Sequence, residues 1–258
     1  MRQEVPQGNE SPRHVLEEIL ANKKKENALR YPEEPSSFME MFKDIEWPIV
    51  IAEIKLKSPS AGKLTDEDPI DLVQKFQQGG AGAISVLTDK KYFGGSPELF
   101  YKIRKATRLP MLWKDFVISA DQLVDAQQRG ADAVLLIVTA LRRQNVDLKA
   151  MINFSKALNL VPVVEVYDGQ DMAQALIAGA DIIGVNSRNL DNLRENLPRA
   201  LEVLRHIPSS RIALLFSSIK SREDVEKARQ AGAKGVLVGT SILKAPDPIE
   251  KLRELTSS

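Results

Sequence analysis

Two carboxylates and two amines stand where they could act together as general acids and bases. Glu53 and Lys55 are two residues apart in an apolar run, so a strand would point both side chains to one face. Lys114 and Glu165 end two further apolar runs. Charges in such surroundings are costly unless paired, and mutual proximity tunes pKa values for proton transfer. We expect an acid–base cluster, with a purely structural ion-pair network as the alternative.

Small and hydroxyl-bearing residues follow the last two apolar runs. Ser217-Ser218 ends one run and Gly239-Thr240 ends the other. Backbone N–H groups in such loops often bind phosphate, and Arg188 could add positive charge. The sequence therefore predicts an anion site, against the alternative of ordinary turn and helix-cap residues.

Composition excludes several kinds of chemistry. The 258 residues include no cysteine, which removes thiol nucleophiles and disulfides, and two histidines are too few for a multi-histidine metal site. Thirty-six Lys and Arg balance 35 Asp and Glu, so no basic nucleic-acid-binding surface is expected. No apolar run is long enough for a membrane span, and residues 1–10 are too polar for a signal peptide, so we expect a cytoplasmic protein.

A repeat indicates which elements carry these residues. Four Gly-Ala pairs recur at intervals of 50, 49 and 53 residues, at Gly80, Gly130, Gly179 and Gly232. Each follows an amphipathic run and precedes a short apolar run, as expected for a helix that ends at a left-handed glycine before a buried strand. Four more strands are predicted between them, at Ile49–Ile54, Met111–Phe116, Val161–Val166 and Ile212–Phe216.

Helical patterns separate these eight strands, for example at Ala120–Arg129, Leu148–Leu158 and Arg222–Ala231. Alternating strands and helices predict a parallel sheet, and eight units in about 210 residues favour a closed (β/α)8 TIM barrel over an open sheet. No G-x-G-x-x-G motif follows the first strand, which argues against a dinucleotide site. Barrel active sites lie at the carboxyl ends of the strands, where all the residues above would meet.

The residues before the barrel form a helical extension, 1–48, while 49–258 form the barrel itself. Ser11 and Pro12 predict the capped start of a helix that continues over His14–Leu29. A second short helix is predicted at Ser37–Phe42. This extension would either cover one end of the barrel or only decorate it.

Several motifs together resemble the indole-3-glycerol-phosphate synthase family over nearly the whole chain. They are Ile51-Ala52-Glu53-Ile54-Lys55 with Ser58-Pro59-Ser60, Ser85-Val86-Leu87-Thr88-Asp89 with Tyr92-Phe93, Lys114-Asp115-Phe116, Val164-Glu165-Val166, Ile183 to Leu190, and Val238-Gly239-Thr240-Ser241. The family closes the indole ring of an anthranilate-derived ribulose phosphate in tryptophan biosynthesis, with loss of carbon dioxide and water.

The resemblance implies a role for each of these residues. Lys114 would be the general acid, Glu165 its acid/base partner, and Glu53 with Lys55 would support them. Substrate contacts would come from Ser58, Phe116, Asn186 and Arg188. Apart from the resemblance, we expect Leu135, Phe216 and Ser217 to contact the substrate as well. The phosphate would lie against Ser217, Gly239 and Thr240, and the loop pattern described above adds Ser218. The resemblance implies neither a cofactor nor a metal.

One strand departs from the family pattern. Where the family carries Glu-Ser-Gly-Ile, this chain has Phe216-Ser217-Ser218-Ile219. A carboxylate has become a phenyl ring, which cannot pair with Lys55 or Lys114; an unpaired buried lysine would cost about 3–5 kcal/mol or have a depressed pKa. If Ser218 needs a positive φ, its strain is roughly 1 kcal/mol, and its Cβ would crowd a phosphate.

This concentrated change favours a rebuilt, engineered active site as the first hypothesis. A carboxylate base, Glu165 or else Glu53, would abstract a proton from a flat aromatic substrate stacked on Phe216, as in an elimination of the Kemp type. A retro-aldol catalyst using the Lys114 amine is a variant of it. The alternatives are a synthase of reduced activity, and a non-catalytic stability variant or phosphate-binding relic. We expect a monomer that binds a small aromatic or sugar-phosphate molecule.

Overall fold

The structure is a computed structural model that describes residues 37–43 and 47–257. Eight parallel strands form a closed barrel in the order β1-β10-β9-β8-β7-β6-β5-β4. They are β1 (Ile49–Ile54), β4 (Ala83–Leu87), β5 (Met111–Lys114), β6 (Ala133–Ile137), β7 (Val161–Val166), β8 (Ile182–Asn186), β9 (Ile212–Phe216) and β10 (Gly235–Val238). Pairing of β1 with both β4 and β10 closes the ring, which confirms the predicted (β/α)8 barrel.

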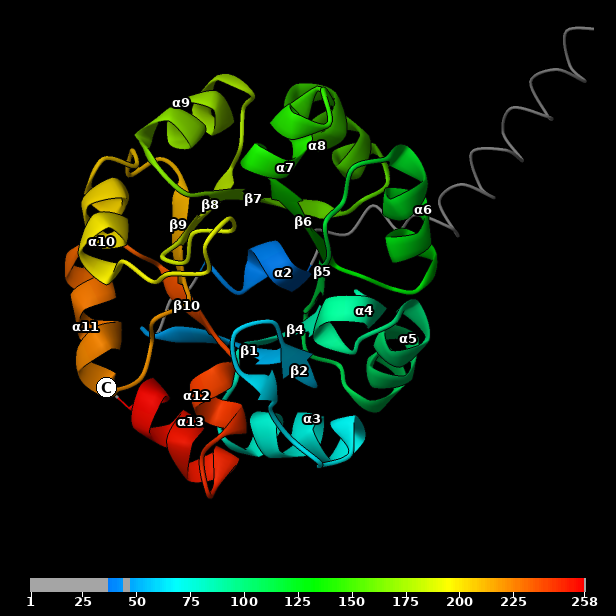
Figure 1. The fold of residues 1–258 in the computed structure, drawn as a ribbon, viewed down its shortest axis with the longest axis vertical. Helices are drawn as coiled ribbons and strands as arrows, with labels where there is room; N and C mark the ends of the chain where they lie inside the picture. The colour runs from blue at the N-terminus through cyan, green and yellow to red at the C-terminus, as the bar shows by residue number, and fades with distance from the viewer. Residues whose placement is uncertain (1–36, 44–46, 258) are drawn as a thin grey trace, which may run out of the picture. The chain divides into compact units, whose positions relative to one another are not determined.

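Helices surround this ring (Figure 1). The longer ones are α3 (Pro69–Gln78), α5 (Pro97–Ala106), α6 (Ala120–Gln128), α8 (Leu148–Ala157), α9 (Gly169–Ile177), α10 (Leu197–Arg205), α11 (Arg222–Gln230) and α13 (Pro248–Thr256). Shorter helices lie in the loops at α4 (Lys90–Phe93), α7 (Val138–Arg143) and α12 (Thr240–Leu243), and a small hairpin joins β2 (Lys57–Ser58) to β3 (Gly62–Lys63). Within the described residues no helix is long and apolar enough to cross a membrane.

The glycine repeat marks four turns from helix to strand, as predicted. Gly80, Gly130, Gly179 and Gly232 have φ values of 89°, 82°, 82° and 97°. Only glycine adopts this left-handed conformation without strain, so each one lets the chain reverse into the next strand.

The third predicted strand is shorter than expected. β5 ends at Lys114 instead of Phe116 because Asp115 bends the chain: its Oδ1 accepts the N–H of Phe116 at 2.8 Å, and its Oδ2 accepts the Thr88 hydroxyl at 2.6 Å. Lys114 is therefore the last strand residue before the loop.

A short helix closes the amino end of the barrel. α2 (Ser37–Glu40) confirms the start of the predicted second helix, and a turn replaces its end. Phe38 and Phe42 are buried in one cluster with Ile49 and Val161, the first residues of β1 and β7. In Figure 1, α2 crosses the middle of the ring of strands. The predicted Ser11-capped helix over His14–Leu29 lies outside the described residues.

Candidate functional site

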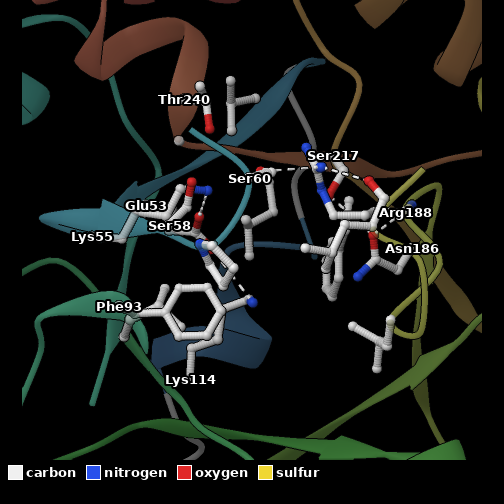
Figure 2. Close-up of a pocket in the computed structure, with 18 of the residues that line it drawn as sticks. Glu53, Lys55, Ser58, Ser60, Phe93, Lys114, Asn186, Arg188, Ser217 and Thr240 are labelled. Atoms are coloured by element: carbon white, nitrogen blue, oxygen red, sulfur yellow. Dashed lines mark hydrogen bonds and ion pairs between the residues drawn. The ribbon is translucent and has the colours of Figure 1, made fainter. Parts of the chain in front are cut away.

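A cavity of about 720 Å³ opens at the carboxyl ends of the strands. Every site residue that the sequence predicts lines it: Glu53, Lys55, Ser58, Lys114, Phe116, Leu135, Glu165, Asn186, Arg188, Phe216, Ser217, Ser218, Gly239 and Thr240. Figure 2 shows Glu53, Lys55 and Lys114 on one side of the cavity, with Asn186, Arg188 and Ser217 across from them. The residues come together because parallel strands deliver their carboxyl ends to one mouth.

Glu53 is the centre of a buried ion-pair network. The carboxylate is 4% exposed; its Oε1 lies 2.6 Å from the Lys55 Nζ, and its Oε2 lies 3.5 Å from the Lys114 Nζ. Burial raises the pKa of Glu53, but the two lysine charges outweigh that effect and bring the pKa below its ordinary value. Glu53 is therefore an anion paired with two cations, and its lowered pKa makes it a weak general base.

Lys114 keeps its partner despite the phenyl ring at Phe216. Burial lowers the pKa of this amine, but the nearby Glu53 and Glu165 carboxylates raise it further, and the net pKa lies above the ordinary value. The expectation that the exchange at Phe216 strands a lysine or depresses its pKa is wrong, because Glu53 contacts both amines.

The surroundings of Glu165 differ from those of Glu53. It is 3% exposed, its Oε1 accepts a hydrogen bond of 3.0 Å from the Asn186 carboxamide, and its Oε2 has no hydrogen-bond partner in the described part of the chain. Burial raises the pKa of Glu165 above its ordinary value, although the Lys114 charge and the Asn186 hydrogen bond oppose the rise. A carboxyl group with a raised pKa holds its proton more readily than an ordinary one, so it can act as a general acid and take the proton back as a base.

Phe216 points into the barrel at the floor of the cavity. Its side chain is 1% exposed and packs on Gly184 of the neighbouring strand β8. A Cβ at Gly184 would lie only 2.3 Å from the Cζ of the ring. Glycine at this position therefore leaves the space that the ring fills, and the ring both lines the cavity and belongs to the core.

The loop after β9 is strained at two consecutive serines. Ser217 and Ser218 have φ values of 66° and 60°, a left-handed conformation that disfavours side chains with a Cβ. Their hydroxyls are both engaged: Ser217 donates to the Asn186 Oδ1 at 3.0 Å, and Ser218 shares a hydrogen bond of 2.7 Å with Ser187. The structure thus confirms the positive φ that the sequence raised as a condition for strain at Ser218.

Gly239 makes room for the ion-pair network. A Cβ here would lie 2.7 Å from the Glu53 Oε1. The glycine precedes α12 and lies in the cavity wall beside Thr240. Two lysines that the sequence analysis did not select, Lys220 and Lys244, line the same cavity. Their position within a few residues of the two predicted phosphate loops is the signal that could have found them.

Arg188 is held by its own loop. Its guanidinium forms an ion pair with Glu195, donates to the Leu193 carbonyl oxygen at 2.8 Å and reaches the Ser60 hydroxyl at 3.4 Å. It lines the cavity with these partners in place, so a ligand would share the guanidinium with them.

An aromatic pair forms part of the cavity wall. The rings of Phe93 and Phe116 lie 6.4 Å apart, and Phe116 is 39% exposed. The sequence predicted Phe116 as a site residue, whereas Phe93 appeared only in a family motif.

In the described residues, no group of three or more His, Cys, Asp and Glu side chains could hold a metal ion.

The fold and this cavity define a (β/α)8 barrel with its candidate active site at the carboxyl ends of the strands. Comparison with a solved structure supports the fold: thiamine phosphate pyrophosphorylase from Pyrococcus furiosus superposes with a TM-score of 0.59 at 18% identity, over 81% of this chain and 93% of that one.

Sequence comparison points to one family among the (β/α)8 barrels. The sequence model of indole-3-glycerol phosphate synthase matches residues 10–255. The synthase of Sulfurisphaera tokodaii is 38% identical over 91% of this chain and 94% of its own length. The synthase of Carboxydothermus hydrogenoformans is 39% identical over 80% of this chain and 78% of its own. The chain belongs to the indole-3-glycerol phosphate synthase family.

Proposed function

We propose that this protein is a lyase that performs the ring closure for which its family is named, as a step of tryptophan biosynthesis. The observation that carries the proposal is the pairing of Lys114 and Glu165. Both line one cavity, where Glu165 is buried and Lys114 partly buried; both have raised pKa values, and each charge acts on the pKa of the other. A lasting cation beside a carboxyl group that can be neutral is suited to a reaction that adds and removes protons in sequence.

Each step of the proposed reaction has a residue to serve it. The Lys114 ammonium protonates the ketone oxygen while the ring carbon that bears the carboxylate attacks the ketone carbon. Loss of carbon dioxide returns the electron pair to the ring. Glu165 then protonates the hydroxyl group, which leaves as water, and the resulting carboxylate takes the proton from the adjacent carbon to complete the indole. One proton is consumed overall, for the carboxylate charge that leaves.

Other residues would hold the substrate. The Phe93 and Phe116 rings offer flat surfaces for the carboxyphenyl group. Ser217, Ser218, Gly239 and Thr240 would meet the phosphate, with Lys220 and Lys244 supplying positive charge on the same wall. Asn186 and Arg188 would contact the sugar between these ends.

Phe216 is expected to make the enzyme slow. The family pattern places a carboxylate at this position, and the phenyl ring can neither accept a proton nor bind a hydroxyl group. Glu53 already compensates both lysines, so the loss falls on the chemistry and not on the charge balance of the site.

The synthase function replaces the first hypothesis from the sequence, which was a rebuilt, engineered active site. The best support for that first hypothesis is the inward ring of Phe216, which could stack on a flat substrate. The related sequences named above are both indole-3-glycerol phosphate synthases, and neither supports an engineered origin or a Kemp-type elimination.

Turnover of the carboxyphenylamino ribulose phosphate tests the proposal. We expect slow appearance of indole fluorescence from the natural chain, an increase of at least about tenfold in Phe216→Glu, and loss in Lys114→Met. No indole from either the natural chain or Phe216→Glu would contradict the proposal. A parallel assay with a nitrobenzisoxazole tests the other hypothesis, which requires elimination that disappears in Glu165→Gln.

A further inference from the structure

An arginine outside the cavity is connected to Glu165 through a chain of direct contacts. Arg199 lies in the first turn of α10, where the Asn196 side chain accepts its backbone N–H at 3.0 Å. Its guanidinium carbon lies 3.6 Å from the centre of the Tyr167 ring. From there its Nη2 donates a hydrogen bond of 2.6 Å to the backbone carbonyl oxygen of Asn186.

Asn186 passes this contact on to the carboxyl group. Its Nδ2 donates to the Glu165 Oε1 at 3.0 Å, and its Oδ1 accepts from the Ser217 hydroxyl and the Arg188 backbone N–H, both at 3.0 Å. The orientation of the carboxamide is therefore fixed by three hydrogen bonds. Asn186 is the last residue of β8, and Arg199 fixes its backbone from the other side.

Tyr167, whose ring lies against Arg199, is itself held in place through its backbone. The backbone N–H of Tyr167 donates to the Oδ2 of Asp171 at 3.2 Å. Asp171 is 2% exposed and also accepts from the Thr139 hydroxyl at 2.9 Å and from the Arg142 Nη1 at 2.7 Å. Tyr167 thus has a rigid base, formed by residues of α7 and α9, on which a cation can be held in one place.

Stability alone explains this arrangement poorly. Arg199 lies without a salt-bridge partner in the described residues, and its buried Nε and Nη1 have no hydrogen-bond acceptor there. The guanidinium is half-buried, and burial lowers its pKa; the Asp168 and Asp171 carboxylates, which lie beyond ion-pair distance, offset this cost only in part. We propose that Arg199, held on Tyr167, is a positioning residue: through the Asn186 carbonyl it fixes the carboxamide that orients Glu165. The link to catalysis rests on the proposed function, but the effect on Glu165 does not.

The direction of the effect follows from the surroundings of Glu165. Lys114 on β5 and the Asn186 hydrogen bond on β8 favour its ionised form, while Glu53 on β1, Asp171 on α9 and burial oppose it. Release of the carboxamide removes one of the two favourable contributions. Loss of Arg199 should therefore raise the pKa of Glu165 by roughly half to one pH unit.

Carbon NMR of protein labelled with ¹³C at the glutamate carboxyl tests this without any need for turnover. Glu165→Gln assigns the Glu165 resonance. We expect its titration to move upward in Arg199→Met and equally in Tyr167→Leu, which removes the ring. Tyr167→Phe, which keeps the ring, should restore the natural titration. Arg205→Met is the matched control, because this exposed arginine of α10 contacts only Glu202 among the described residues.

The path through Asn186 is tested in an Asn186→Ala background, where Arg199→Met should move the titration no further. If the protein turns over the ribulose phosphate, Arg199→Met should lower kcat about tenfold with little change in KM. Unchanged titration of Glu165 in Arg199→Met, with only a lower Tm, would overturn the inference and assign Arg199 a structural role. An upward shift in a chain without synthase activity would keep the inference and refute only the proposed function.

Discussion

At the scale of single residues, Glu165 is the clearest case in which function and stability oppose each other. Its folded-state pKa is raised by burial, so the folded protein binds a proton that the unfolded chain releases. Between the ordinary carboxyl value, about pH 4.3, and the raised value, stability must therefore fall as pH rises, by at most about 1.4 kcal/mol per pH unit.

Glu165→Gln removes this dependence because the amide is always neutral. We expect the variant to match the natural chain near pH 4, to become progressively more stable than it as pH rises, and to keep a constant advantage above the raised pKa. Urea unfolding over pH 4–8 measures this difference. A constant difference over the whole range would show that Glu165 is ionised without penalty.

Ser218 offers a second test at one position. Its φ of 60° is unfavourable for any residue with a Cβ. Ser218→Ala and Ser218→Gly both lose the hydrogen bond to Ser187, but only glycine relieves the backbone. We expect the glycine variant to be more stable than the alanine variant by about 0.5–1 kcal/mol. Thermal unfolding of the pair decides it, and equal stabilities would refute strain at this serine.

At the scale of elements, β8 and β9 are fitted to each other inside the barrel. The ring of Phe216 occupies the space over Gly184, so Gly184→Ala should cost about 1–3 kcal/mol through overpacking. Phe216→Leu should be less harmful in the Gly184→Ala background than in the natural chain, because the shorter side chain relieves the collision.

Gly169→Ala is the control for this pair. Gly169 begins α9, and a Cβ there meets no atom within 4 Å. We expect this substitution to change stability by less than about 0.5 kcal/mol. Strictly additive effects of Gly184→Ala and Phe216→Leu in denaturant unfolding would contradict the packing described here.

The elements were largely predictable because their signals are local. The left-handed glycines, the apolar runs and the capping residues each depend on a few neighbours in sequence, and parallel strands place their carboxyl ends together without further information. Glu53, Lys114, Glu165 and Phe216 could therefore be placed in one cavity from the sequence. The prediction overextended β5, since the bend at Asp115 depends on the distant Thr88 hydroxyl.

Contacts between elements were not predictable in the same way. The sharing of Glu53 by two lysines depends on side-chain rotamers, and the stacking of Arg199 on Tyr167 depends on how α10 packs beside the end of β7. Neither leaves a pattern in the sequence. The strained Ser218 was recognised only because the family pattern has glycine there.

At the scale of the whole molecule, the proposed anion site gives a prediction that needs no catalysis. A ligand that binds only the folded state stabilises it, by about 2.7 kcal/mol at one hundred times its dissociation constant. Inorganic phosphate at that level should raise the Tm by roughly 5–10 °C. Sodium chloride of equal ionic strength is the control, and an equal rise with chloride would refute a phosphate site at this cavity.

The short helix α2 bears on how molecules enter and leave the cavity. Phe38 and Phe42 belong to the same buried cluster as Phe216 at the floor of the cavity, so the barrel interior is filled on that side and the cavity opens at the carboxyl ends of the strands. Under the proposed reaction, the substrate enters through this opening, and the indole product, carbon dioxide and water leave through it. The loops around the opening would therefore govern both substrate entry and product release.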